Sequence, residues 1–213
     1  RGCSVFSANR VVMQCVPRLA AAISEQSCFS IELVRGYGLQ SFRDDVKELM
    51  IKTGVKGERV AFLFTDTQVV SDDFLEDINN VLNTGEVPNI FPADELERVI
   101  GDMRDVCKAL GVVDTRANCW KTFISRVREN LHIVLAMSPV GDNLRVWCRQ
   151  FPSLINCTTS DDYLSWPRAA LEAVATTKLA SLELVNNDDR PKLVDMCTQV
   201  HMGVGVVADD SWD

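Results

Sequence analysis

An acidic residue at the end of an apolar segment, one position after its last apolar residue, offers the clearest chemistry in this sequence. Residues 60–64 read VAFLF, and Thr65 and Asp66 come next. A strand buried on both faces of a parallel sheet needs continuous apolar side chains, and the carboxyl ends of such strands are where open α/β sheets gather ligands. A carboxylate there can hold Mg²⁺, directly or through water, beside the phosphates of a nucleotide. Asp66 is therefore a candidate metal-binding residue, although the same short pattern is common in strands that bind no metal.

The elements around Asp66 predict an α/β fold. Residues 131–137 (LHIVLAM) indicate a second buried strand, and shorter strands are predicted at residues 28–34 and 154–158. Apolar residues at helical spacing predict helices between the strands, at about residues 18–24, 42–50, 72–82, 96–110, 120–131 and 140–150. Strands that alternate with helices favour a parallel sheet with helices on both faces.

The strand pattern stops after Trp166 and Pro167. Apolar residues then recur at helical spacing over residues 171–179 and 193–207, with a loop predicted at residues 186–190. We interpret these two helices as the start of a small helical lid.

Composition excludes several classes of function. The net charge is −8 and no basic stripe appears, which argues against a nucleic-acid partner. The eight cysteines form no CxxC pair and are expected to be reduced thiols in the cytosol. Neither histidine has a cysteine or carboxylate at ligand spacing, so histidine-based metal chemistry is not expected. No signal peptide or spanning segment is recognisable, and we expect no membrane partner.

A longer stretch carries a specific resemblance. TDTQVVSDDFLEDINNVLNTGEVPNIFPADE, which contains Asp66, resembles the fourth AAA+ module of dynein heavy chains in its axonemal form. The resemblance continues through FSIELVRGYGLQSFRDDVKELMIKTGVKG upstream and ENLHIVLAMSPVGDNLRVWCRQFPSLINCTTSDDYLSWPRAALEAVA downstream. It covers about residues 16–210. The fold it implies is an AAA+ P-loop NTPase-like parallel sheet with helices on both faces, followed by a partial lid.

The resemblance gives Asp66 and Thr67 defined roles. Asp66 matches the Walker B acid, which coordinates nucleotide-bound Mg²⁺ in this family. Thr67 stands where a catalytic glutamate would follow. A threonine hydroxyl cannot serve as the base that orients the attacking water, so the resemblance implies binding of ATP or ADP with slow or absent hydrolysis. No catalytic residue is assigned.

The phosphate-binding loop of the family has no clear counterpart. A P-loop needs glycines, so that backbone N–H groups can surround a phosphate, together with a lysine and a hydroxyl. The sequence here reads SANRVVMQCVPRLAAAI, with Met13 in place of the lysine and Cys15 in place of the hydroxyl. We therefore expect residues 1–15 to be an atypical segment in which the phosphate loop is lost, which argues against intrinsic nucleotide affinity.

Four other residues are candidates by resemblance. Ser138 follows the second buried strand, where AAA+ proteins keep a polar sensor residue, and an alternative role for it is to cap a helix. Arg145 and Arg149 lie in the region that supplies an arginine finger to a neighbouring module, with solvent exposure as the alternative. Arg168 is a candidate lid sensor.

These expectations define three segments and two alternative functions. The segments are the atypical residues 1–15, the large AAA+ subdomain 16–160 and the partial lid 161–213, and the chain is expected to be a fragment of a longer polypeptide. The first function is a regulatory, nucleotide-binding dynein module in the cytoplasm, cytoskeleton and ciliary axoneme. Its implied partners are neighbouring AAA+ modules, intermediate and light chains, and microtubules. The alternative is a structural remnant without nucleotide. An independent P-loop enzyme is disfavoured because it needs an intact phosphate loop.

Overall fold

The computed structural model describes residues 3–7, 10–138, 142–162, 166–180 and 189–210. Two compact units divide the chain after residue 163. The first unit holds the sheet, and the second consists of helices.

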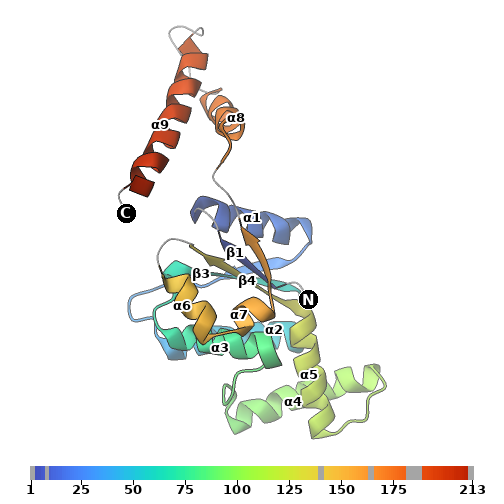
Figure 1. The fold of residues 1–213 in the computed structure, drawn as a ribbon. Coiled ribbons are helices and arrows are strands. Elements are labelled where there is room, and N and C mark those ends of the chain that lie inside the picture. Colours follow the sequence, from blue (N-terminus) through green and yellow to red (C-terminus); the bar gives the residue numbers. More distant parts are fainter. Residues whose placement is uncertain (1–2, 8–9, 139–141, 163–165, 181–188, 211–213) are drawn as a thin grey trace. The chain divides into compact units, whose positions relative to one another are not determined.

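Five parallel strands form the sheet of the first unit (Figure 1). Their order across the sheet is β2-β3-β4-β1-β5, so the chain crosses over between strands that are not neighbours. The strands are β1 (Ser4–Ser7), β2 (Ser27–Ser30), β3 (Val60–Thr65), β4 (Leu131–Met137) and β5 (Thr159–Asp162). This arrangement confirms the predicted parallel α/β architecture and brings the carboxyl ends of all five strands to one edge.

Strands β3 and β4 are buried because they lie inside the sheet and are covered on both faces. Every residue of β3 is buried, and β4 is buried except for the half-buried His132. The two strands pair from Val60 opposite Leu131 to Thr65 opposite Ala136. Their continuous apolar runs are thus explained by their central position.

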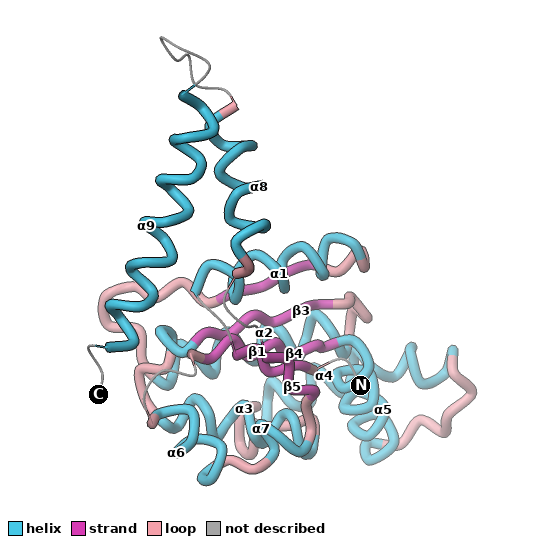
Figure 2. The backbone as a smooth tube through the Cα atoms, turned by 45° about the horizontal axis from the view of Figure 1, so that its top comes forward, coloured by secondary structure: helices cyan, strands magenta, loops and turns pink. Residues whose placement is uncertain are grey.

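Helices cover both faces of this sheet (Figures 1 and 2). Helix α1 lies on one face and contacts β2, β3 and β4, while α2, α3 and α7 lie on the other. The helices of the first unit are α1 (Arg10–Ile23), α2 (Leu39–Gly54), α3 (Asp72–Thr84), α4 (Ala93–Ala109), α5 (Arg116–Asn130), α6 (Asn143–Gln150) and α7 (Ser153–Asn156). A short 3-10 turn, η1 (Asp66–Gln68), follows β3.

Helix α3 begins and ends where local sequence signals place it. The Ser71 side chain accepts a hydrogen bond from the Asp73 backbone N–H at 3.3 Å, which satisfies one of the free donors at the helix start. Gly85 ends the helix with a φ of 86°, a left-handed conformation that glycine adopts without steric cost.

Aromatic rings fill the core between the sheet and helices α2 and α3. Phe42 and Phe74 stack with their ring centroids 4.4 Å apart, and Phe64 of β3 lies 5.9 Å from Phe42. All three side chains are fully buried. Burial of each stabilises the fold by roughly 1.5–3 kcal/mol relative to an exposed position. These rings therefore pack strand β3 against helices α2 and α3.

Helices α4 and α5 pack as a hairpin that is inserted before β4. Phe91, Trp120 and Phe123 form a cluster of ring contacts at centroid distances of 5.2–6.1 Å. Trp120 Nε1 donates a hydrogen bond to Glu86 at 3.0 Å. Phe123 belongs to the core, and Phe91 and Trp120 pack against it.

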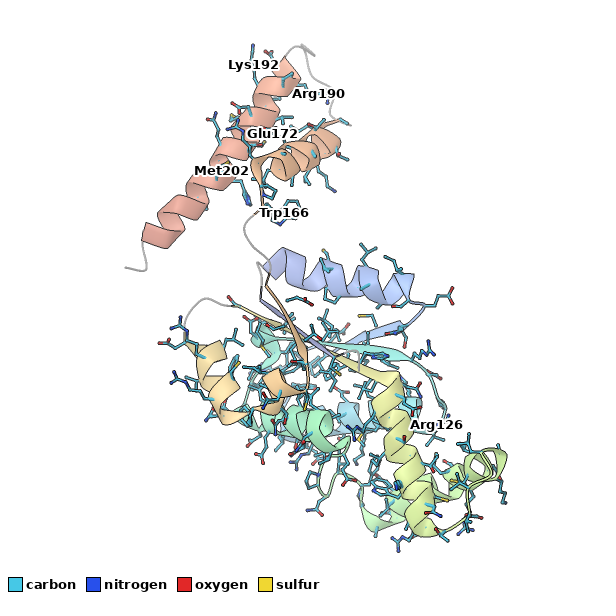
Figure 3. All side chains as sticks on the ribbon, turned by 45° about the vertical axis from the view of Figure 1, so that its right-hand side comes forward. Arg126, Trp166, Glu172, Arg190, Lys192 and Met202 are labelled. Atoms are coloured by element: carbon cyan, nitrogen blue, oxygen red, sulfur yellow. The ribbon has the colours of Figure 1, made fainter. Side chains whose placement is uncertain are left out.

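The second unit contains helices α8 (Arg168–Leu179) and α9 (Arg190–Asp210), which pack against each other. Both helices were predicted from the sequence. The predicted loop at residues 186–190 falls mostly outside the described residues, and Arg190 is the first residue of α9. Figure 3 labels Glu172 on α8 and Arg190 on α9. None of the described helices is both long enough and apolar enough to cross a membrane.

Three local expectations differ from the structure. The predicted strand at residues 154–158 is wrong, because α7 occupies Ser153–Asn156 and the strand β5 begins only at Thr159. Pro152 precedes α7 with helical backbone angles and initiates a turn there. The predicted strand at 28–34 ends earlier, at Ser30. No strand was predicted before residue 28, yet Ser4–Ser7 forms β1 between β4 and β5.

Candidate functional site

Asp66 and Ser138 meet at the carboxyl edge of the sheet. Asp66 is the first residue after β3, and Ser138 is the first residue after β4. Because Thr65 pairs with Ala136, the two strands end within one residue of each other. The Ser138 backbone N–H donates a hydrogen bond to Asp66 Oδ2 at 3.2 Å. Two of the predicted site residues are thus brought together, with the half-buried Asp66 carboxylate held by a backbone donor of the neighbouring strand.

Threonine residues flank Asp66 in the chain on both sides. Thr67 is exposed, and its Oγ1 lies 3.0 Å from Thr65 Oγ1. Among the described residues, no group of three or more histidine, cysteine or acidic side chains could hold a metal ion. Carboxylate and hydroxyl oxygens suit Mg²⁺, which usually keeps several waters and binds through one or two carboxylates plus phosphates of the substrate. The protein side of this edge therefore fits a metal ion that arrives with a nucleotide.

The residues at the position of a phosphate-binding loop fit a nucleotide less well than Asp66 does. Strand β1 ends at Ser7, level with Met137 of β4, and helix α1 begins at Arg10. Only residues 8 and 9, which lie outside the described part of the chain, connect them. Met13 and Cys15 are already within the helix, and neither residue type supplies the ammonium or hydroxyl group of a phosphate loop. The edge of the sheet thus presents the Asp66 carboxylate, while Met13 and Cys15 supply no lysine and no hydroxyl group.

Helix α6 carries Arg145 and Arg149 one turn apart, and both are exposed. Arg145 Nη1 lies 3.9 Å from Asp142 Oδ1, and both of these side chains are at least 80% exposed, so the pair contributes little to stability. Trp147 Nε1 donates a hydrogen bond to Asp72 Oδ1 at 3.1 Å and ties α6 to the start of α3. Within the described residues, no hydrogen bond or ion pair joins either arginine to Asp66. Their role toward another module stays a prediction.

Arg168 belongs to the second unit, where it joins the two helices. Its Nε lies 2.8 Å from Glu172 Oε1, and its Nη2 lies 2.5 Å from Asp195 Oδ1. The hydrogen bond to Glu172, followed by the charge of Asp195, raises the pKa of Arg168. The observed contacts explain Arg168 as a link between α8 and α9. Its predicted role as a sensor of nucleotide stays a prediction.

Sequence reasoning missed Gln68. Its side chain is buried, with 8% exposed, and forms hydrogen bonds to the ends of both β2 and β3. The signal in the sequence was a glutamine two residues after Asp66, just beyond the predicted strand. A buried amide at the end of a sheet usually satisfies backbone groups that lack a strand partner.

Comparison with known proteins places this geometry in a family. The family model described as "P-loop containing dynein motor region D4" matches residues 11–212. Dynein axonemal heavy chain 6 of Homo sapiens is 47% identical over 197 residues, which are 92% of this chain and 5% of that protein. Dynein axonemal heavy chain 1 of Mus musculus is 44% identical over 189 residues, or 88% of this chain and 4% of the relative. The Dynein-1-beta heavy chain of the flagellar inner arm I1 complex of Chlamydomonas reinhardtii is 42% identical over 187 residues, with the same coverage.

The chain thus spans about one twentieth of the length of these relatives. Strands β2, β3, β4 and β5, the acid after β3 and the helices α8 and α9 all lie within the matched residues, and β1 precedes them. A match over nearly the whole sequence, together with this parallel sheet, leaves one assignment. The chain belongs to the P-loop containing dynein motor region D4 family and has its AAA+ α/β fold.

Proposed function

We propose that the chain is a regulatory AAA+ module of an axonemal dynein heavy chain, which binds ATP or ADP with Mg²⁺ and hydrolyses it slowly or not at all. The observation that supports this most is the Asp66 carboxylate at the edge of the sheet, held by the Ser138 N–H at 3.2 Å. This position corresponds to the end of a buried strand, where α/β proteins bind nucleotides.

The residues at this edge have distinct roles in the proposal. Asp66 orients the water shell of the metal, and the Ser138 backbone keeps the carboxylate in place. Bound Mg²⁺ would supply neutralisation of the phosphate charge. Thr67, which has no carboxylate, accepts no proton from an attacking water near neutral pH, so the bound nucleotide would persist. A long-lived nucleotide state suits regulation better than force production.

The wider role follows from the relatives, whose names place them in axonemes, cilia and flagella. We propose that the module acts in the cytoskeleton of the ciliary axoneme, in contact with neighbouring AAA+ modules of the same heavy chain. Arg145 and Arg149 on the exposed face of α6 would reach the nucleotide of a neighbour, and Arg168 would sense the state of this one. Microtubules, intermediate chains and light chains would be engaged only through the complete complex.

A second candidate function is a scaffold that holds no nucleotide. The observation in its favour is that Met13 and Cys15, which stand in place of the lysine and the hydroxyl, lie within helix α1. Neither side chain supplies the ammonium or hydroxyl group that a phosphate-binding loop uses. In this case the module would pass conformational changes between neighbouring modules through side-chain packing, without a bound nucleotide.

Calorimetric titration of the purified chain with ATP and ADP in the presence of Mg²⁺ separates the two functions. Asp66→Asn removes the charge with little change of size, and Asp105→Asn, at a side chain that is 92% exposed, is the matched control. Micromolar binding that weakens at least about tenfold, or about 1.4 kcal/mol, only in Asp66→Asn supports the regulatory module. Absence of binding by protein with a cooperative thermal transition supports the scaffold, and binding unaffected by Asp66→Asn excludes the proposed site.

A further inference from the structure

The Gln68 side chain occupies a place in the sheet that a backbone peptide group would normally fill. Its Oε1 accepts a hydrogen bond from the Thr65 backbone N–H at 2.8 Å. Its Nε2 donates to the Ile31 carbonyl at 2.5 Å and to Ser30 Oγ at 3.2 Å. One primary amide therefore joins the residue after β2 to the last residue of β3, and both the acceptor and the donor of the amide are used.

The register of the two strands explains why an amide is needed there. The β2–β3 ladder runs from Ser27 opposite Val60 to Ser30 opposite Leu63, and the Ser27 N–H donates to the Arg59 carbonyl. In a parallel ladder of this register, alternate residues of one strand donate to the other, so a continued ladder would join the Thr65 N–H to the Ile31 carbonyl directly. The ladder instead stops, and the Gln68 amide is inserted between these two groups.

This insertion closes a small ring around the candidate metal-binding residue. Thr65 and Gln68 are the two ends of the ring, and Asp66 and Thr67 lie between them. On its other side, β3 is held by β4 up to the Thr65–Ala136 pair. The backbone that carries Asp66 is thus fixed from both neighbouring strands, and its carboxylate faces the Ser138 N–H.

We propose that Gln68 is a positioning residue, which acts by holding the Asp66 carboxylate against Ser138 and toward a bound metal ion. The inference rests on the proposed nucleotide function for its consequence, but the positioning itself is a property of the protein alone. Without the amide, the Thr65 N–H and the Ile31 carbonyl lose their partner and the turn η1 loses its attachment to β2. Asp66 would then sample several orientations.

Substitution Gln68→Met tests this directly, because methionine has nearly the same length and shape without a donor or acceptor. Gln40→Met is the matched control, since Gln40 is an exposed glutamine that bonds only to Asp44 of its own helix among the described residues. The first measurement is amide hydrogen exchange at Ser138 by NMR. We expect exchange at least about tenfold faster in Gln68→Met than in Gln40→Met, because the acceptor at Asp66 is no longer held in place.

The second measurement is the affinity for ATP with Mg²⁺ and with EDTA. If Gln68 positions Asp66, Gln68→Met should reduce the gain in ATP affinity that Mg²⁺ produces. The affinity for ATP in EDTA should be unchanged. General loosening of the fold would weaken both equally. If Gln68→Met does not fold, Gln68→Glu takes its place: it keeps the acceptor for Thr65 and loses the donor to Ile31, and the same two changes are expected at about threefold or more.

The outcomes separate this inference from the function on which it rests. If the parent chain binds no nucleotide in either condition, the regulatory function fails, and Ser138 exchange alone decides whether Gln68 positions Asp66. If Ser138 exchange and the Mg²⁺-dependent gain in the folded Gln68 variant both match those of Gln40→Met, the positioning role is overturned.

Discussion

Asp66 and Ser138 are separated by 72 positions in the chain, yet the Ser138 N–H lies 3.2 Å from Asp66 Oδ2. Their contact results from two parallel strands that end within one residue of each other, with Asp66 directly after β3 and Ser138 directly after β4. A backbone donor costs no side-chain entropy when it holds a carboxylate. The protein's own backbone thus holds the Asp66 carboxylate at this edge of the sheet.

Substitution Thr67→Glu should convert a nucleotide-binding module into a slow ATPase. The new carboxylate would stand directly after Asp66 and could orient and deprotonate a water. We expect Mg²⁺-dependent phosphate release to rise at least about tenfold, which is less than the roughly 100-fold or more that a well-placed general base contributes. Thr67→Gln has the same size without the base and is the control. Unchanged phosphate release in a variant that still binds ATP would show that the water is not placed at this residue.

Substitution Gly54→Ala should destabilise the fold at the contact between α2 and α5. A Cβ atom at Gly54 would lie 2.3 Å from Phe123 Cε2 and 2.9 Å from Val127 Cγ2, and both side chains are fully buried. Overpacking of this kind costs about 1–3 kcal/mol. Gly101→Ala, inside α4 with no atom within 4 Å of its Cβ position, should instead stabilise by about 0.5–1 kcal/mol. The midpoint of urea unfolding measures the change in stability of each variant. Equal shifts of the midpoint in Gly54→Ala and Gly101→Ala would contradict the close packing at Gly54.

Acidification should destabilise the protein through His132 on β4. Burial, and next the charge of Arg59, lower the pKa of His132 below its ordinary value of 6.5. The unfolded chain therefore binds a proton more readily, so the free energy of unfolding is fully retained above about pH 6.5 and decreases as the pH falls below it. His132→Gln should flatten this part of the curve, measured by denaturant unfolding between pH 7.5 and 5. The exposed His201 provides the control variant His201→Gln, which should keep the slope of the parent chain.

Thiol labelling should separate the cysteines by position. Burial, followed by contacts with Cys107 and Asp114, raises the pKa of Cys119 to about 11. At pH 8 only roughly a thousandth of this thiol is the reactive thiolate. Iodoacetamide should therefore modify the exposed Cys15, Cys28 and Cys197 first, and Cys119 only after guanidinium is added, as mass spectrometry of peptides will show. Modification of Cys119 as fast as Cys197 in the folded chain would mean that the α4–α5 hairpin opens readily.

Local sequence determined those parts of the protein whose signals lie within a few residues. The continuous apolar runs at 60–64 and 131–137 identified the two central strands and placed Asp66 and Ser138 at their ends. Ser71 and Gly85 bounded α3, since caps act on the backbone groups next to them. The resemblance of the stretch around Asp66 added the family, which the match over residues 11–212 confirms.

Tertiary structure alone decided the rest, because the interactions concerned join residues far apart in the chain. Ser4–Ser7 has no strong strand signal and becomes β1 because β4 and β5 supply hydrogen-bond partners on both sides. The attachment of α6 to α3 through Trp147 and Asp72 is equally invisible to periodicity. Gln68 lies next to Asp66, but its role depends on where β2 ends, 37 positions away. Periodicity reports which side chains are buried, whereas the partners of a buried polar group are settled only when the strands come together.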